Sequence, residues 1–170
     1  MEEKDLPYLK RFWIYQKERF PVFVNLIAVT TFTFSAISYS RICRGADGFV
    51  SWDTYLIGCF ATFTLFFLVR VFDEFKDKED DAKYRTYLPV PRGLVKLSEL
   101  KTLGIIITIL QITVIAVFQM KMLYLYVIVL GYLCLMGVEF FIPEYLKKRQ
   151  ILYITSHMLI FPLLDIYSSG

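Results

Sequence analysis

The sequence has few of the residues that build most zinc and disulfide sites. Of its 170 residues, only three are cysteine and one is histidine. Cys43, Cys59 and Cys134 lie far apart, without CxxC or Cys/His spacing. They therefore predict neither a zinc site nor a disulfide framework. His157 stands alone in an apolar segment, where packing is a commoner role than base catalysis, although an ionisable group inside a membrane span is also a candidate for function.

A strong excess of charge of one sign is also absent. The chain carries 19 basic and 16 acidic residues, a net charge of only +3. Nucleic-acid-binding domains typically show a pronounced basic surplus, so we expect no nucleic-acid partner.

The N-terminus, MEEKDLPYLKRFWIYQKERF, lacks the apolar core of a secretory signal peptide. We interpret residues 1–20 as an amphipathic cytoplasmic segment along the membrane surface. Its apolar side would carry Leu6, Leu9, Phe12 and Trp13.

Long hydrophobic runs make up much of what is present, and 56% of the residues are hydrophobic. A helix needs about 20 mostly apolar residues to cross a membrane. Five segments approach this length: Pro21–Tyr39, Trp52–Phe72, Leu103–Phe118, Met122–Ile142 and Ile151–Tyr167. The sequence therefore predicts an all-α, multi-pass transmembrane helix bundle of about five spans over residues 21–170, in contact with the lipid bilayer.

The basic residues between these segments predict their orientation. Alternate sides of the membrane would carry 16 and 3 lysines and arginines. Under the positive-inside rule, the N-terminus and the Asp-rich loop at residues 73–101 are cytoplasmic.

The densest charge directly follows the second apolar segment. If that helix continues to about Arg85, an arc of about 60° holds Asp73, Asp77 and Asp80 at 100° per residue, with Asp81 just beside it. Clustered carboxylates either raise their pKa values or share a cation. An oxygen-only ligand set in contact with water suits Mg²⁺.

An ordinary solvated helix is the alternative explanation. Three acid-to-base pairs lie four residues apart: Glu74–Lys78, Glu79–Lys83 and Asp81–Arg85. Such pairs stabilise helices by about 0.2–0.5 kcal/mol each. They leave unexplained a face of aspartates with Arg70, because glutamate is the better helix former. The charge pattern alone leaves both explanations open.

The stretch from Arg70 to Gly93 resembles the UbiA superfamily of intramembrane prenyltransferases. Family members carry an NDxxDxxxD-like motif at the end of the second helix, followed by a loop that commonly reads RPxxxG. The corresponding residues here are Asp73, Asp77, Asp80 or Asp81, Pro89, Pro91 and Gly93. The chain departs from the pattern at Phe72, where asparagine is usual, in the aspartate spacing, and at Leu88, where arginine is usual.

The resemblance implies transfer of a prenyl group from a polyprenyl diphosphate to a hydrophobic or aromatic acceptor, with Mg²⁺ as cofactor. It implies catalytic roles for Asp73 and Asp77. The implied metal ligands are Asp73, Asp77, Asp80 and Asp81, and the candidate substrate contacts are Arg70, Lys76, Arg85, Arg92 and Asn25. An amide such as that of Asn25 in a membrane span more commonly bonds a neighbouring helix, which is the alternative role.

Two other functions stay open: a non-catalytic membrane protein that retains the fold, and a small cation-binding transporter. A transporter would need further polar groups at mid-membrane, where the spans offer Asn25, Gln111 and hydroxyl residues. UbiA-like enzymes have about nine helices and two Asp-rich motifs, whereas here Asp165 has no aspartate three or four positions away. We expect the 170 residues to be incomplete as a catalyst, and to be completed by a homo-oligomer, a partner subunit or a missing second half.

Overall fold

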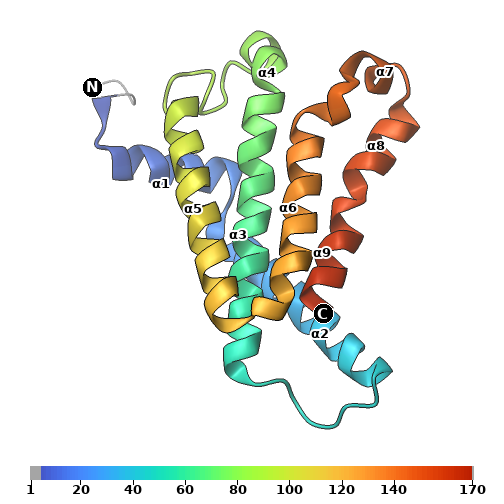
Figure 1. Cartoon of the computed structure of the whole chain (residues 1–170). Coiled ribbons are helices and arrows are strands. Elements are labelled where there is room, and N and C mark those ends of the chain that lie inside the picture. The colour runs from blue at the N-terminus through green and yellow to red at the C-terminus, as the bar shows by residue number, and fades with distance from the viewer. Residues whose placement is uncertain (1–4, 170) are drawn as a thin grey trace.

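The computed structural model describes residues 5–169 as helices joined by turns and loops, with no strand among them (Figure 1). The α-helices are α1 (Tyr8–Arg19), α2 (Val22–Cys43), α3 (Trp52–Lys76), α4 (Lys78–Tyr84), α5 (Leu97–Phe118), α6 (Leu123–Gly137), α7 (Pro143–Lys147), α8 (Gln150–Met158) and α9 (Ile160–Ser169). Two 3₁₀ turns, η2 (Met120–Met122) and η3 (Glu139–Phe141), flank α6. The predicted all-α class is confirmed.

Five helical segments are long and apolar enough to cross a membrane, as the sequence predicted. They are Val22–Cys43, Trp52–Lys76, Leu97–Phe118, Met120–Gly137 and Gln150–Ser169. The third begins at Leu97, earlier than predicted, because the Glu99 carboxylate accepts a hydrogen bond from the Lys96 backbone N–H at 2.8 Å and caps the helix. The fourth ends at Gly137, where η3 follows within two residues.

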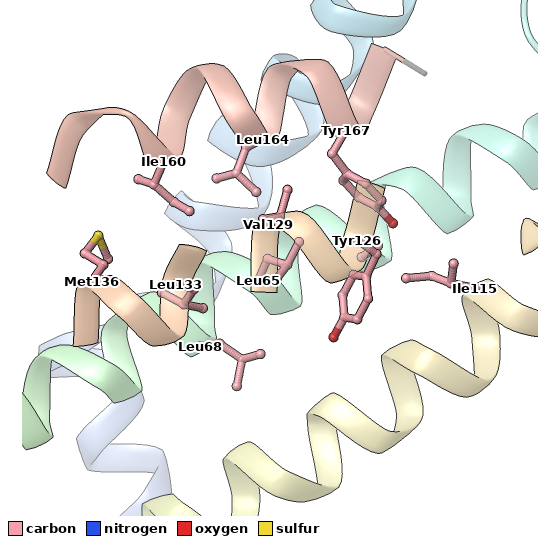
Figure 2. Packing of buried hydrophobic residues seen from close by; sticks show 11 residues of the cluster. Leu65, Leu68, Ile115, Tyr126, Val129, Leu133, Met136, Ile160, Leu164 and Tyr167 are labelled. Carbon is pink, nitrogen blue, oxygen red and sulfur yellow. The ribbon is translucent and has the colours of Figure 1, made fainter. Parts of the chain in front are cut away.

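Helix α3 lies at the centre of the bundle and contacts α2, α5 and α6. Its buried residues include Leu65 and Leu68, which join a cluster with side chains of α5, α6 and α9 (Figure 2). The cluster also contains Ala61, Ile115, Tyr126, Val129, Leu133, Met136, Ile160, Leu164 and Tyr167. Lipid tails are as apolar as these side chains, so close packing holds the helices together here.

A buried amide links three of the spans. Gln111 of α5 is fully buried and donates to the Thr64 hydroxyl at 2.7 Å and to the Ala61 carbonyl at 3.2 Å, both on α3. Its carbonyl oxygen accepts a hydrogen bond from the Tyr126 hydroxyl of α6 at 2.8 Å. Both polar atoms of the Gln111 side chain therefore have hydrogen-bond partners, as buried polar groups in a lipid environment require.

The N-terminal helix α1 packs against the bundle through one face. Tyr15 is fully buried, and Phe12 contacts the Phe67 ring with centroids 6.4 Å apart. The predicted helix is present from Tyr8 onward, and residues 1–4 lie outside the described residues. Phe12 differs from the expectation, because its ring lies towards α3 while Leu9 and Trp13 remain exposed.

Helix α6 approaches α3 closely at Gly137. A Cβ atom at this position would collide with the ring of Phe72, whereas one at Gly131, also in α6, would meet nothing within 4 Å. The approach of these two helices therefore depends on the missing side chain at residue 137.

We expect Gly137→Ala to destabilise the bundle by about 1–3 kcal/mol, because the Phe72 ring must leave its rotamer or α6 must shift. Gly131→Ala is the matched control, and it should be neutral or stabilising by up to about 1 kcal/mol from helix propensity. Unfolding in mixed detergent micelles, followed by circular dichroism, measures both. Equal effects of the two substitutions would contradict the close approach.

Candidate functional site

The Asp-rich segment does not form one continuous helix to Arg85. Helix α3 ends at Lys76, and Asp77 has φ −88° and ψ 7° before α4 begins at Lys78. Two backbone hydrogen bonds continue across this turn, from Asp77 N to Asp73 O at 2.9 Å and from Asp81 N to Asp77 O at 2.8 Å. The acidic side chains of this segment form two groups on different sides of it.

The first group faces α8. The Lys76 ammonium lies 3.7 Å from an Asp73 carboxylate oxygen and 3.8 Å from one of Asp77. It also donates a hydrogen bond to the Tyr153 hydroxyl of α8 at 3.0 Å. Lys76 is thus held between two carboxylates of its own helix end and a tyrosine 77 positions away.

Beside this group lies a cleft of about 290 Å³, which we call the α8 cleft. Its lining is formed by Lys76, Asp77, Asp80, Glu139, Leu146, Lys147, Gln150 and Tyr153. Carboxylates, ammonium groups, an amide and a phenol therefore face one space at one end of the helix bundle. This combination can hold a polar, multiply charged ligand.

The second group is buried on the side that faces α1. The Glu74 side chain is only 1% exposed and accepts hydrogen bonds from Arg19 at 2.7 Å and from Arg70 at 3.0 Å. Asp81, 4% exposed, lies 3.3 Å from Arg85 and 3.9 Å from Arg19. These ion pairs neutralise both carboxylates inside the protein, which a buried charge requires.

The predicted site residues are therefore only partly brought together. Asp73, Asp77, Asp80 and Lys76 lie at or beside the α8 cleft, whereas Asp81 and Arg85 pair with each other on the other side. Arg70 connects the two groups, since it also lies 3.7 Å from Asp73.

Two further candidates lie elsewhere. Arg92 makes two hydrogen bonds to Glu18 of α1, at 2.8 and 2.9 Å, and this contact lowers the pKa of Glu18. Asn25 donates to the Pro21 carbonyl of its own helix turn at 2.9 Å, so it bonds locally and not to another helix.

Sequence reasoning missed several cleft residues. Lys147, Gln150 and Tyr153 lie about 70 positions or more beyond the Asp-rich segment in the chain, and no spacing rule connects them to it. Glu74 was assigned to a solvated pair with Lys78, but its partners are Arg19 and Arg70. Glu139 carried the one usable signal, a carboxylate at the end of a predicted span.

An aromatic stack supports the inner wall of the cleft. The Lys76 ammonium lies 5.5 Å from the centroid of the Tyr153 ring, and His157 stacks on that ring at 4.2 Å. Phe140 meets the His157 ring at 6.3 Å and the Tyr132 ring at 5.5 Å, both edge-on. His157 therefore has a packing role, and its Nδ1 bonds the Tyr153 carbonyl oxygen at 2.9 Å.

Three residues in left-handed backbone conformation place Glu139 at this cleft. Glu139, Phe140 and Phe141 have φ of 48°, 55° and 60°, and none is glycine. Each such residue costs roughly 1–2 kcal/mol. Unfavourable conformations of this kind persist only where the surroundings determine them, and they are frequent at functional sites.

We expect the Phe141→Gly variant to be more stable than the Phe141→Ala variant by about 1–2 kcal/mol, because only glycine adopts φ near 60° without a steric cost. Comparing Phe141→Gly with Phe141→Ala cancels the loss of the exposed ring. The same pair of substitutions at Phe118, the last residue of α5, should show no such preference for glycine. Unfolding in detergent measures the four variants, and an alanine preference at 141 would contradict the left-handed turn.

The donor chemistry of the cleft is compatible with a magnesium ion. Among residues 5–169, no three acidic, histidine or cysteine side chains already converge on one point as a metal site. Asp73, Asp77 and Asp80 nevertheless supply carboxylate oxygens at a water-accessible edge, which Mg²⁺ accepts while keeping several of its waters. The Lys76 ammonium lies within 3.8 Å of both Asp73 and Asp77, so a Mg²⁺ ion bound to these two carboxylates would displace it towards the cleft.

Comparisons with known proteins give no independent assignment: no protein-family model, no curated protein and no solved structure matches the chain significantly. The interpretation of the site therefore rests on its own residues and on the motif resemblance.

Proposed function

We propose that the chain belongs to a UbiA-like, Mg²⁺-dependent prenyltransferase, which transfers a prenyl group from a polyprenyl diphosphate to a hydrophobic or aromatic acceptor. The observation that carries this proposal is the α8 cleft. It combines Asp77, Asp80, Lys76 and Lys147 at one end of an apolar helix bundle. An amphiphile with a charged head and an apolar tail matches such a boundary.

The cleft residues suit a diphosphate leaving group. A Mg²⁺ ion held by Asp73, Asp77 and Asp80 would neutralise charge that develops on the phosphate oxygens. Lys76 and Lys147 would donate hydrogen bonds to the same oxygens. In this proposal Tyr153 is a positioning residue, because its hydroxyl and ring hold the Lys76 ammonium at the cleft.

Arg85 and Arg92 are secondary candidates for the diphosphate contact. Each would have to leave a carboxylate partner, Asp81 or Glu18, before it could reach a ligand in the cleft. We therefore assign the anion contact first to Lys76 and Lys147, and then to Arg70, which borders Asp73 at 3.7 Å.

The proposal includes an orientation. The α4 end of the bundle, with the α8 cleft, would face the cytoplasm, because 16 of the 19 basic residues fall on that side. The prenyl chain would then enter from the inner leaflet, beside the apolar surfaces of the spans. No observation favours the transporter alternative, since the Gln111 amide is bonded inside the bundle and the exposed Asn25 amide bonds its own helix turn.

We expect Asp73→Asn and Asp77→Asn each to weaken Mg²⁺-dependent binding of farnesyl diphosphate by at least about 10- to 100-fold, because each removes a carboxylate ligand of the metal, and even the residues that support metal ligands are worth this much. Isothermal titration calorimetry of the detergent-solubilised chain, with and without Mg²⁺, measures this. Glu79→Gln removes the same charge from an exposed position of α4 and should change binding less than twofold.

An equal loss in Glu79→Gln would show a diffuse charge effect and contradict a site at the α8 cleft. Equal affinity with and without Mg²⁺ would contradict the metal role. Absence of any farnesyl diphosphate binding by the folded wild-type chain would favour the non-catalytic alternative.

A further inference from the structure

Helix α1 has two different faces, and the bundle covers only one of them. At 100° per residue, an arc of about 100° contains Arg11, Tyr15 and Phe12, all of which contact the bundle. On the other side, an arc of similar width contains Leu9, Trp13, Lys17 and Lys10. All four are exposed, Leu9 to 79% and Trp13 to 52%. We call these four residues the outer face of α1.

The contacts of the inner face fix the height of α1 along the bundle. Arg11 bonds Glu99 at 2.6 Å and the Leu94 carbonyl at 2.8 Å, beside the first turn of α5. Arg19 bonds Glu74 in the last turn of α3. Both anchors lie at the ends of predicted membrane spans. Helix α1 therefore crosses the bundle near its α4 end (Figure 1), at the level where hydrocarbon gives way to headgroups.

The chemistry of the outer face matches that level. Tryptophan is enriched at membrane–water interfaces, and Leu9 beside it supplies further apolar surface. The Lys17 ammonium lies 5.2 Å from the centroid of the Trp13 ring, so charge and aromatic ring form one unit. The acidic residue within α1, Glu18, is turned to Arg92 and leaves the outer face without a carboxylate of this helix.

We propose that the outer face of α1 is a binding surface for anionic phospholipid headgroups of the adjoining bilayer. Trp13 and Leu9 enter the interface, while Lys10 and Lys17 contact the phosphate and other anionic groups. The attraction of one lysine to an anionic membrane surface corresponds to an enrichment of anionic lipids beside it of about fivefold. The two lysines act locally, because the Debye length is only about 8 Å at physiological salt.

Fluorescence of Trp13 in the full chain tests this surface. The chain has two tryptophans, so Trp52→Phe, at the exposed start of α3, leaves Trp13 as the reporter. The protein is placed in nanodiscs of phosphatidylcholine with one-fifth phosphatidylglycerol, in two matched preparations. The bromine quencher is carried on phosphatidylglycerol in one preparation and, at the same mole fraction, on phosphatidylcholine in the other.

We expect the brominated phosphatidylglycerol to quench Trp13 several-fold more than the brominated phosphatidylcholine. Lys10→Gln/Lys17→Gln should bring the two close to equality, and so should 1 M salt, where the Debye length is about 3 Å. The matched control is Lys83→Gln/Lys101→Gln, which removes the same charge from exposed positions of α4 and α5 and should keep the preference.

Three results would overturn the proposal. Equal quenching by the two brominated lipids in the wild-type background would show that the outer face does not select anionic headgroups. Loss of the preference in the control variant would assign it to the overall field of the protein. Absence of quenching by either lipid would show that protein, such as a second copy of the chain, covers Trp13.

Discussion

The α4 end of the molecule depends on the ion pairs of one buried carboxylate, that of Glu74. Its side chain is 1% exposed and accepts hydrogen bonds from Arg19 of α1 at 2.7 Å and from Arg70 of α3 at 3.0 Å. Loss of one partner from a buried ion pair costs about 3–5 kcal/mol, because the remaining charge has no solvent. The ion pair between Arg19 and Glu74 and the burial of Tyr15 therefore both hold α1 at the end of α3.

The acidic residues of this segment form ion pairs on two different sides. Glu74 and Asp81 are committed to arginines on the α1 side, while Asp73 and Asp77 share a lysine on the α8 side. The helical period already favours this division, since Glu74 and Asp81 lie about 20° apart on a helical wheel and about 80–100° from Asp73. One short segment thus has one half that is bonded to arginines on the α1 side and another half at the α8 cleft.

The same segment connects the two proposed surfaces. The outer face of α1 is the proposed lipid surface, the inner face of α1 bonds Glu74 through Arg19, and Arg70 lies between Glu74 and Asp73 beside the α8 cleft. The contacts from Arg19 through Glu74 and Arg70 to Asp73 are ion pairs whose side chains are at most 29% exposed. Among the apolar spans, the hydrogen bonds of the Gln111 amide connect α5 to α3 and α6 in a similar way.

The sequence by itself determined the all-α class, the five candidate spans and the position of the charged segment at the end of the second span. These follow from local properties: an apolar run long enough for a bilayer, and charges placed at its end. The sequence also indicated the N-terminal helix, although its wheel could not tell that Phe12 packs inward while Leu9 and Trp13 stay outside, since both kinds of side chain are apolar.

Only the tertiary structure decided which charges meet. Arg19 and Glu74 are 55 positions apart, and Lys76 and Tyr153 are 77 apart, so no helical period connects them. A pattern of four-residue spacings assigned Glu74 to Lys78, because local rules can rank only local partners. The left-handed turn at residues 139–141 was equally hidden, since nothing in Glu-Phe-Phe favours positive φ. The ring of Phe140 in this turn contacts Tyr132 and His157, which are distant in the sequence.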